Sequence, residues 1–510
     1  MRDTKYLHND KWLPIIYFIL GFLLLQLLDV FELELVSFIA KNIFLFFFLF
    51  YNIKRYRKST PQNWLLNPAV LASIMTFFLG FCLTNFVYFI PGSEDEKQMY
   101  RLLGSEPLIY FNKGMNAIIM AAIAMWIGYN SKLGIKLYHL ILRFPINFKQ
   151  YFRSSFVPDL KIIYLFFALA IAARLYAIYL GIYGFSQSPE KVSASIGISY
   201  ILLSITDLTS LLLLVVSFVY FRNPKNFNYK FTFIIILIIE IGFGMLSGMK
   251  SAVVMPIILS FITYYLVNNK IHKGFIITAF GLIIIAYIII EPFRQIRMRD
   301  ASFQSTPGYI ANTMVDAYFL NKSRKVVYGT DDILTSILSR NAYLLPASKS
   351  IQFEDERGLG PADPDFLEKI YTLPLQAFIP RLFWADKPVE DFARWYSVNV
   401  WGGTATTSVA MTPIGFLYFA GGLVFIILGF FLIGILQKTL WQFYLAGGGQ
   451  LLIFLAMLNT VVLIDSSFNG MIVYWLRYIP IFILLQSFIL KRTNPQIRGQ
   501  VVYPVLYERL

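Results

Sequence analysis

The sequence has little charge for its length. Only 14% of its 510 residues are charged, whereas 57% are hydrophobic and 17% are aromatic. An ordinary globular domain has about a quarter charged residues, so this composition is typical of a chain solvated largely by lipid. The net charge of +15 would suit nucleic acid in a soluble protein. Membrane proteins, however, collect basic residues in their inward loops, and nucleic acid is therefore not an expected partner.

Cysteine, histidine and several catalytic motifs are scarce or absent. The single cysteine, Cys82, lies in an apolar run, which excludes a disulfide framework and a thiolate metal site. Nucleotide-binding glycine loops, HExxH and GxSxG do not occur, so ATP hydrolysis, dinucleotide binding, zinc proteolysis and serine hydrolysis have no support. His8, His139 and His272 fall on segments expected to face inward. An outward active site would then need a carboxylate as its base.

Long apolar runs are abundant. A transmembrane helix needs about 20 mostly apolar residues, and such windows recur twelve times in the sequence. We therefore expect an all-α integral membrane protein with about twelve transmembrane helices. The expected spans are 13–29, 35–52, 66–90, 114–130, 161–184, 197–221, 231–248, 251–268, 274–292, 421–437, 445–465 and 471–490.

Loop charge predicts the orientation of these spans. Because basic loops stay on the cytoplasmic side, we expect both chain ends inside and the acidic or neutral loops outside. The basic loops contain Lys54, Arg55, Arg57, Lys58, Arg222, Lys225, Lys230, Lys270 and Lys273, and the acidic ones contain Asp29, Glu32, Glu34, Glu94, Asp95, Glu96 and Glu106.

The chain then divides into four parts. Residues 1–292 hold spans one to nine, 293–410 form a large outward loop, 411–490 hold a re-entrant segment and spans ten to twelve, and 491–510 form a cytoplasmic tail. Loops as long as 293–410 are usually functional.

Helical patterns also occur outside the spans. In the large loop, apolar spacing predicts short helices at 309–319 and 332–345. Residues 411–422 begin at Thr412-Pro413 and end at Gly421-Gly422, which suggests a half-helix dipping into the membrane. The inward loop 131–161 alternates basic and apolar residues, as an interfacial amphipathic helix broken at Pro145 would.

Basic residues are concentrated where the positive-inside rule does not expect them. Arg294, Arg297 and Arg299 follow the ninth span directly, and guanidinium groups suit bidentate phosphate binding. They suggest an anionic group at the outer membrane surface, such as a lipid pyrophosphate, although a long loop can also contain charges without a ligand. Further basic residues of this loop are Arg324, Lys325, Arg340, Arg357, Arg381, Lys387 and Arg394.

Several charges fall within or beside spans. Arg174, Asp207 and Glu240 lie inside spans, Lys250 lies in the turn 247–251, and Arg477 lies near the outer end of the last span. An ionised group at the bilayer centre costs about 2.5 to 3.5 kcal/mol on insertion scales, so such residues face a cavity or pair internally. Arg174 is therefore either a ligand contact or the structural partner of an acid. The large loop also holds aromatic residues that suit sugar faces or interfacial belts: Trp384, Phe392, Trp395, Tyr396 and Trp401.

These segments together resemble a known family. Ser247–Ser251, the arginines at 294, 297 and 299, the block Ile379–Pro388 and the stretch 407–422 look like the Wzy-type oligosaccharide repeat-unit polymerases of bacterial envelopes. The resemblance implies an inverting transferase of glycosyltransferase C-like fold on the outer face of the bacterial cytoplasmic membrane. Its substrate would be glycan linked to undecaprenyl pyrophosphate, and its partners would be the bilayer and possible chain-length regulators and flippases.

The expected mechanism has a growing glycan on undecaprenyl pyrophosphate as donor and a hydroxyl of a new repeat unit as nucleophile. No nucleotide cofactor or metal is required, because cations can stabilise the departing pyrophosphate. We expect Asp386 or Asp300 to take the proton, unless each only pairs with a neighbouring basic residue. Trp384, Trp395 and Tyr396 are expected to stack on the glycan. The predicted pyrophosphate contacts are Arg294, Arg297, Arg381, Lys250, Lys387, Arg174, Arg340 and Arg477.

Other functions stay open at this point. A transferase that uses a lipid monophosphate sugar would take Glu32 or Glu34 as its base. A related O-antigen ligase is expected to use an outward histidine, which the predicted map lacks, and this favours the polymerase. A flippase or transporter of lipid-linked glycan would line its pathway with Arg174, Asp207 and Glu240. Two acidic runs, 331–332 and 354–356, also have the oxygen ligands for a hard cation.

Overall fold

The computed structural model describes residues 13–59, 63–143, 157–184, 205–299 apart from 207, 307–323, 341–358, 392–403, 411–446 and 450–462, with short stretches and single positions elsewhere. The described chain is helical except for a two-residue antiparallel pairing of β1 (Val157–Pro158) with β2 (Leu490–Lys491). It forms two compact units. Unit 1 comprises Met1–Phe148, Leu334–Gly447 and Met457–Phe482, and unit 2 comprises Lys149–Ile333, Gly448–Ala456 and Ile483–Leu510.

Nine helices within the described residues are long and apolar enough to cross a membrane. They match the predicted spans one to five and seven to ten, so the expectation of a multi-pass helical membrane protein is confirmed at this level. The sixth and eleventh predicted spans correspond to shorter apolar helices, Leu208–Arg222 and Ile453–Val462. The twelfth falls mostly outside the described residues.

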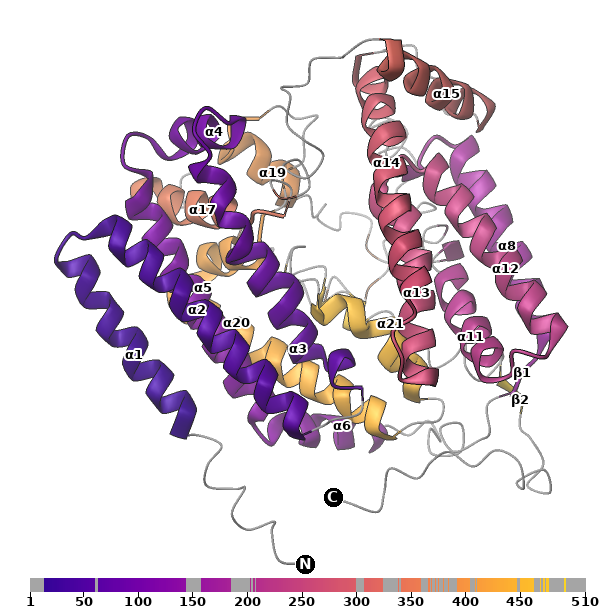
Figure 1. The fold of residues 1–510 in the computed structure, drawn as a ribbon, viewed down its shortest axis with the longest axis horizontal. Coiled ribbons are helices and arrows are strands. Elements are labelled where there is room, and N and C mark those ends of the chain that lie inside the picture. Colours follow the sequence, from indigo (N-terminus) through magenta and orange to yellow (C-terminus); the bar gives the residue numbers. More distant parts are fainter. Residues whose placement is uncertain are drawn as a thin grey trace, which may run out of the picture. The chain divides into compact units, whose positions relative to one another are not determined.

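Unit 1 is built around α5 (Pro107–Asn130) and α20 (Pro413–Ala446), which make its most extensive described helix contact. The two backbones approach closely: a Cβ at Gly128 would lie 2.1 Å from the carbonyl oxygen of Phe431, and one at Gly434 would lie 2.0 Å from that of Met125. Small residues permit such close packing between membrane helices. The hairpin of α1 (Leu13–Val30) and α2 (Glu34–Ser59) lies beside α5 (Figure 1).

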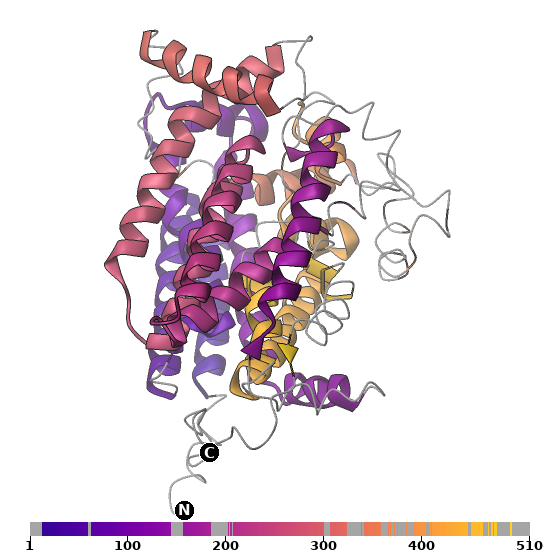
Figure 2. The same ribbon diagram turned by 90° about the vertical axis from the view of Figure 1, so that its right-hand side faces the viewer.

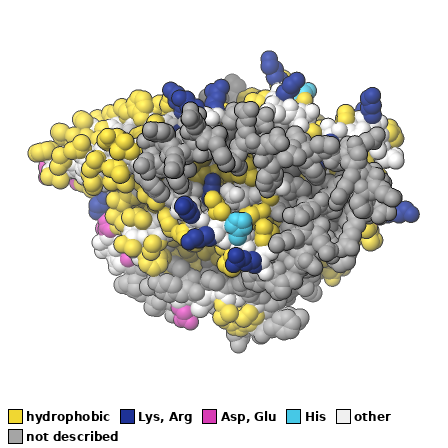
Figure 3. All heavy atoms as spheres, turned by 90° about the horizontal axis from the view of Figure 1, so that it is seen from below, with side chains coloured by type: hydrophobic (Ala, Val, Ile, Leu, Met, Phe, Trp, Pro, Cys, Tyr) yellow, Lys and Arg dark blue, Asp and Glu magenta, His cyan; other side chains and the backbone are white. Residues whose placement is uncertain are grey.

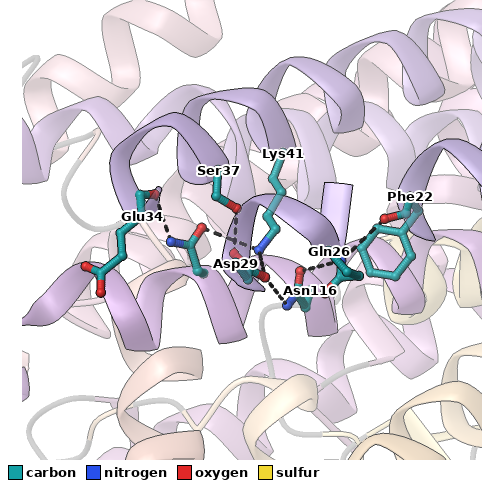
Figure 4. A network of polar contacts seen from close by, with 8 residues as sticks. Phe22, Gln26, Asp29, Glu34, Ser37, Lys41 and Asn116 are labelled. Atoms are coloured by element: carbon teal, nitrogen blue, oxygen red, sulfur yellow. Dashed lines mark hydrogen bonds and ion pairs between the residues drawn. The ribbon is translucent and has the colours of Figure 1, made fainter. Parts of the chain in front are cut away.

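A polar network joins this hairpin to α5 (Figure 4). Lys41 is fully buried in α2, and its Nζ contacts Oδ2 of Asp29 in α1 at 2.5 Å. Ser37 and Asn116 donate to the same carboxylate, at 2.6 and 3.2 Å. A buried charge within a membrane helix needs such partners, so the network fixes α1 and α2 against α5. The sequence placed Asp29 in an outward acidic loop, whereas the helix continues through it.

Short elements complete unit 1. Its third span joins α3 (Pro68–Ala72) to a π-helix (Ser73–Gly80) and a 3-10 helix (Leu83–Phe89), after the 3-10 turn Trp64–Leu66. Within this unit, α4 (Glu94–Leu103), α17 (Leu344–Arg357) and α19 (Phe392–Asn399) lie at one end, and α6 (Leu133–Arg143) lies at the other (Figure 1). The helix α21 (Gln450–Val462) begins in unit 2 and ends in unit 1.

The predicted amphipathic helix is present as α6 and ends before Pro145. Its Tyr138 is buried, whereas Leu133, Ile135 and Leu140 are exposed. Figure 3 shows the face that includes α6, on which Lys and Arg side chains gather beside hydrophobic ones. This pattern suits a helix lying at a lipid headgroup surface.

Unit 2 is a second group of helices (Figure 2). It contains α8 (Leu160–Tyr179), α11 (Leu208–Arg222), α12 (Phe227–Leu246), α13 (Lys250–Asn268), α14 (Lys273–Arg299) and α15 (Pro307–Ser323). Asp159 and Asn226 cap the starts of α8 and α12 by accepting backbone N–H groups. The helix α15, predicted over 309–319, packs against α14.

Several predicted boundaries are wrong. The helix α14 continues to Arg299, so Arg294, Arg297 and Arg299 lie on a helix that extends past the apolar run and not in a loop. The helix α5 begins seven residues before its predicted start, at Pro107, because proline suits the first helical turn. The helix α20 runs from Pro413 to Ala446 with the expected break at Gly421–Gly422. The helices α4 and α17 were not predicted, and most of the helix expected at 332–345 lies outside the described residues.

Candidate functional site

An open hollow of about 570 Å³ lies in unit 1, where α4, α17 and the segment after α19 meet. Three basic residues, one carboxylate and two aromatic residues share its lining: Arg101, Lys349, Arg357, Glu356, Phe353 and Trp401. Charge pattern predicts an outward position for all three of these segments. The hollow therefore offers an anionic ligand three basic side chains in one space.

Three backbone contacts hold the α17 side of the hollow in place. The Tyr343 N–H before α17 donates to the carbonyl of Gly80 at 3.0 Å. The Tyr396 hydroxyl of α19 donates to the carbonyl of Pro346 at 2.7 Å. Lys349 donates to the carbonyl of Leu102 in α4 at 2.7 Å. These bonds tie α17 to the third span, to α19 and to α4.

The basic side chains have different environments. Burial lowers the pKa of Lys349, and neighbouring Arg357 lowers it further, while Glu356 opposes the change. Arg357 lies over the Phe353 ring, 5.7 Å from its centroid. Among the described residues, neither Arg101 nor Arg357 forms an ion pair with a carboxylate. Their guanidinium groups can therefore accept an external anion without displacing an internal one.

Two of the three carboxylates at the end of α17, those of Asp355 and Glu356, are held in different ways. Asp355 contacts Lys113 of α5 at 2.5 Å and accepts a 2.8 Å hydrogen bond from Tyr418 of α20, so a cation already neutralises its charge. Glu356 instead accepts two neutral donors at Oε1, the Tyr110 hydroxyl and the Gln352 amide, each at 2.9 Å. Its Oε2 accepts no hydrogen bond from the described part of the chain. One oxygen is thus fixed and the other is available to a ligand.

The acidic run at 354–356 is one of the two predicted sites for a hard cation. In the described residues, no group of three or more histidine, cysteine or acidic side chains is arranged to hold a metal ion. The carboxylates at 355 and 356 instead bind Lys113, Tyr110, Tyr418 and Gln352. The second acidic run, 331–332, lies outside the described residues.

The predicted glycan-stacking residues have different positions. The Tyr396 side chain is fully buried, and burial raises the pKa of its hydroxyl. Its role as a stacking residue is therefore wrong, because no face of the ring is accessible. Trp395 packs against Phe353, Phe366 and Phe419, with ring centroids 5.1 to 6.5 Å apart. Trp384 is partly exposed, and Trp401 is the tryptophan that lines the hollow.

Arg174 lies in a buried ion pair of unit 2. Its guanidinium contacts both carboxylate oxygens of Glu240, at 2.5 and 3.0 Å, and donates to the Thr209 hydroxyl at 2.6 Å. It also lies over the Phe243 ring at 5.1 Å. Of the two roles left open by the sequence, the structural pair fits this arrangement, since Arg174 is 7% exposed and its guanidinium holds a carboxylate. The alternative partner, Asp207, lies outside the described residues.

The remaining predicted site residues that the structure describes lie in unit 2, where Val253 and Val254 at the start of α13 pack against Ile290 near the end of α14. Lys250 begins α13 and Arg294 lies in α14, both in unit 2, and Arg297 lies further along α14. The other predicted contacts lie outside the described residues, namely Asp300, Arg340, Arg381, Asp386, Lys387 and Arg477.

The sequence singled out neither Arg101 nor Lys349, and it considered Glu356 only as a cation ligand. The sequence contains a weak indication for Arg101, which lies in the last turn of a short helix. The first turn of this helix is acidic and its start is capped by Ser93. The sequence contains no such indication for Lys349.

A scan of family models found no match to the chain, and searches of curated proteins and of solved structures found none either.

Proposed function

We propose that the protein is a glycosyltransferase that joins oligosaccharide repeat units carried on undecaprenyl pyrophosphate, at the outer face of a bacterial cytoplasmic membrane. The observation that carries the proposal is the hollow of unit 1, in which basic side chains, an anchored carboxylate and a tryptophan line one space. Basic side chains can bind the pyrophosphate, the carboxylate can accept the hydroxyl proton, and the tryptophan ring can stack on a sugar.

The basic residues would bind the donor. Pyrophosphate becomes the leaving group when the glycosidic carbon is attacked, and charge accumulates on its oxygens. Arg101 and Arg357 provide planar guanidinium groups that match phosphate oxygens in pairs, and Lys349 adds a point charge. Fixed cations aimed at developing charge lower the barrier without a metal ion.

Glu356 would act as the base, a role for which Asp386 and Asp300 are the candidates in the sequence. The acceptor hydroxyl oxygen forms a bond to the anomeric carbon, the bond from that carbon to the pyrophosphate oxygen breaks, and the hydroxyl proton passes to Oε2 of Glu356. Tyr110 and Gln352 keep the carboxylate in place during this step. Attack from the face opposite the leaving group gives inversion.

The residues that carry the family resemblance and lie outside this hollow keep their predicted roles. The resemblance predicts that Arg294, Arg297, Arg381 and Lys250 bind pyrophosphate and that Trp384 contacts glycan. These predictions are independent of the hollow of unit 1, because Arg294, Arg297 and Lys250 belong to unit 2. A flippase has less support, because two of the charges that would line its pathway, Arg174 and Glu240, bind each other.

The test is reconstitution of the purified protein with an undecaprenyl-pyrophosphate-linked repeat unit, followed by gel analysis of the glycan. We expect a ladder that persists in excess chelator. Glu356→Gln should reduce its rate roughly a hundredfold or more, as for loss of a general base. Glu94→Gln is the matched control, because Glu94 is exposed and pairs only with Lys97 in the same turn.

Three results would contradict the proposal. A full rate in Glu356→Gln would exclude this carboxylate as the base. Transfer of the glycan to a different lipid acceptor, without a ladder, would identify a ligase. Movement of the substrate across liposomes without any joining would identify a flippase.

A further inference from the structure

A second hollow, of about 470 Å³, lies in unit 2, where α11 and α13 end and α12 and α14 begin. The charge pattern of the sequence predicts that these ends face the cytoplasm. Five aromatic side chains and one histidine form most of its wall: Tyr220, Phe221, Phe233, Tyr264, Phe275 and His272. The proposed glycosyl transfer uses none of them.

The wall is formed by rings that support one another. Tyr220 stacks on Phe233 with centroids 5.3 Å apart. Phe221 meets Tyr264 edge-on at 5.3 Å, and Tyr264 meets Phe275 at 5.6 Å. These rings come from four different helices, so the wall joins the ends of α11, α12, α13 and α14 through aromatic contacts.

His272 contributes a polar group to this apolar wall. Its Nδ1 accepts a hydrogen bond of 3.1 Å from the Gly274 N–H, and its ring meets that of Tyr264 at 5.4 Å. An Nδ1 that accepts a hydrogen bond leaves Nε2–H as the donor of the neutral ring. The histidine can therefore donate to an anion.

Three lysines are close in the sequence to residues that line the hollow. Lys225 follows the lining residue Pro224, and Lys270 and Lys273 stand on either side of His272; all three are exposed. Glu240 is the only acidic residue between Leu208 and Ile290 in the sequence, and it is bound to Arg174. Exposed lysines therefore adjoin the lining residues on two sides of the hollow in the sequence, and Asp159 is the acidic residue that acts on the first turn of α12, through Tyr229.

We propose that this hollow binds an anionic phospholipid of the inner leaflet. The aromatic wall takes the glycerol and upper acyl region, and Lys270, Lys273 and His272 bind the phosphate. Basic pockets between membrane helices on the cytoplasmic side favour anionic headgroups, and aromatic rings favour the interfacial depth. A neutral lipid would leave the lysines unused, and a small soluble anion would leave the rings unused. This proposal does not depend on the proposed function.

The test uses native mass spectrometry of the purified full chain, titrated in detergent with dioleoyl phosphatidylglycerol or dioleoyl phosphatidylcholine. We expect one phosphatidylglycerol to bind more tightly than the others. Lys270→Gln/Lys273→Gln should weaken that binding about tenfold or more, because two cations near the headgroup are lost. Lys132→Gln/Lys136→Gln is the matched control, since it removes the same charge from the α6 region.

A third variant tests the hollow itself. Asn268 lines the hollow and is exposed, so Asn268→Trp fills the space without removing a charge. It should also abolish tight binding. Retention of tight binding in Asn268→Trp, an equal loss in the α6 control, or equal affinity for phosphatidylcholine would each overturn the proposal.

Discussion

The hydroxyl of Tyr110 in α5 donates a 2.9 Å hydrogen bond to Oε1 of Glu356 in α17, although 246 positions separate the two residues in the sequence. The same helix α5 supplies Lys113 to the neighbouring Asp355. A membrane helix therefore contacts two of the three carboxylates at the end of α17: Lys113 neutralises Asp355, and the Tyr110 hydroxyl helps to hold Glu356.

Tyr110→Phe removes one of the two donors that fix Glu356 and leaves the ring in place. Because a hydrogen bond of this kind contributes about 1 kcal/mol, we expect the polymerisation rate to fall roughly fivefold with little change in thermal stability. Tyr100→Phe is the control, since Tyr100 is half exposed and lies outside the hollow lining. An unchanged rate in Tyr110→Phe would mean that the bond does not position the base.

Lys349 gives the hollow a pH dependence. Its pKa is lowered from 10.5, so its charge is lost at a lower pH than that of an ordinary lysine, while the guanidinium groups stay charged. Affinity for inorganic pyrophosphate should therefore fall as pH rises through this lowered pKa, measured by calorimetry, and Lys349→Arg should remove the decline. Over the same window the unfolded chain binds more protons than the folded one, so this group makes stability rise with pH. A decline that persists in Lys349→Arg would assign it to another group.

Replacing one partner of the Arg174–Glu240 pair should destabilise unit 2 strongly. Loss of one partner leaves a buried charge and costs about 3 to 5 kcal/mol, whereas replacing both with apolar residues of similar size is far less harmful. We therefore expect Arg174→Met to lower the melting temperature more than Arg174→Met/Glu240→Leu does. Loss of glycan transfer in a stable double variant would instead show that the pair acts in the reaction and not only in folding.

Gly128→Ala tests the close approach of α5 and α20. The added Cβ would overlap the Phe431 carbonyl oxygen at 2.1 Å, and overpacking of this kind costs about 1 to 3 kcal/mol or more. The variant should lose thermal stability, whereas Gly242→Ala in α12 should not, because nothing lies within 4 Å of a Cβ there. Equal stability of the two variants would contradict the packing.

The sequence by itself determined the helical, membrane-spanning class and the approximate limits of most spans. Long apolar runs must form helices in lipid, where every backbone polar group needs a partner within the segment. For this reason the predicted spans at 13–29, 231–248 and 251–268 differ from α1, α12 and α13 by only a few residues. The break at Gly421–Gly422 was also readable, because two adjacent glycines permit a non-helical backbone.

Only the tertiary structure decided which charges act together. Arg101 and Lys349 are 248 positions apart in the sequence, yet they line one hollow because α17 packs against α4 and α5. Sequence spacing cannot show such a meeting, since it depends on how helices pack and not on local pattern. Likewise the sequence predicted Tyr396 as a stacking residue and left two roles open for Arg174, whereas in the structure Tyr396 is buried and Arg174 pairs with Glu240. Hydrophobic periodicity indicates which residues face lipid or water. Which polar side chains contact one another depends on how the helices pack.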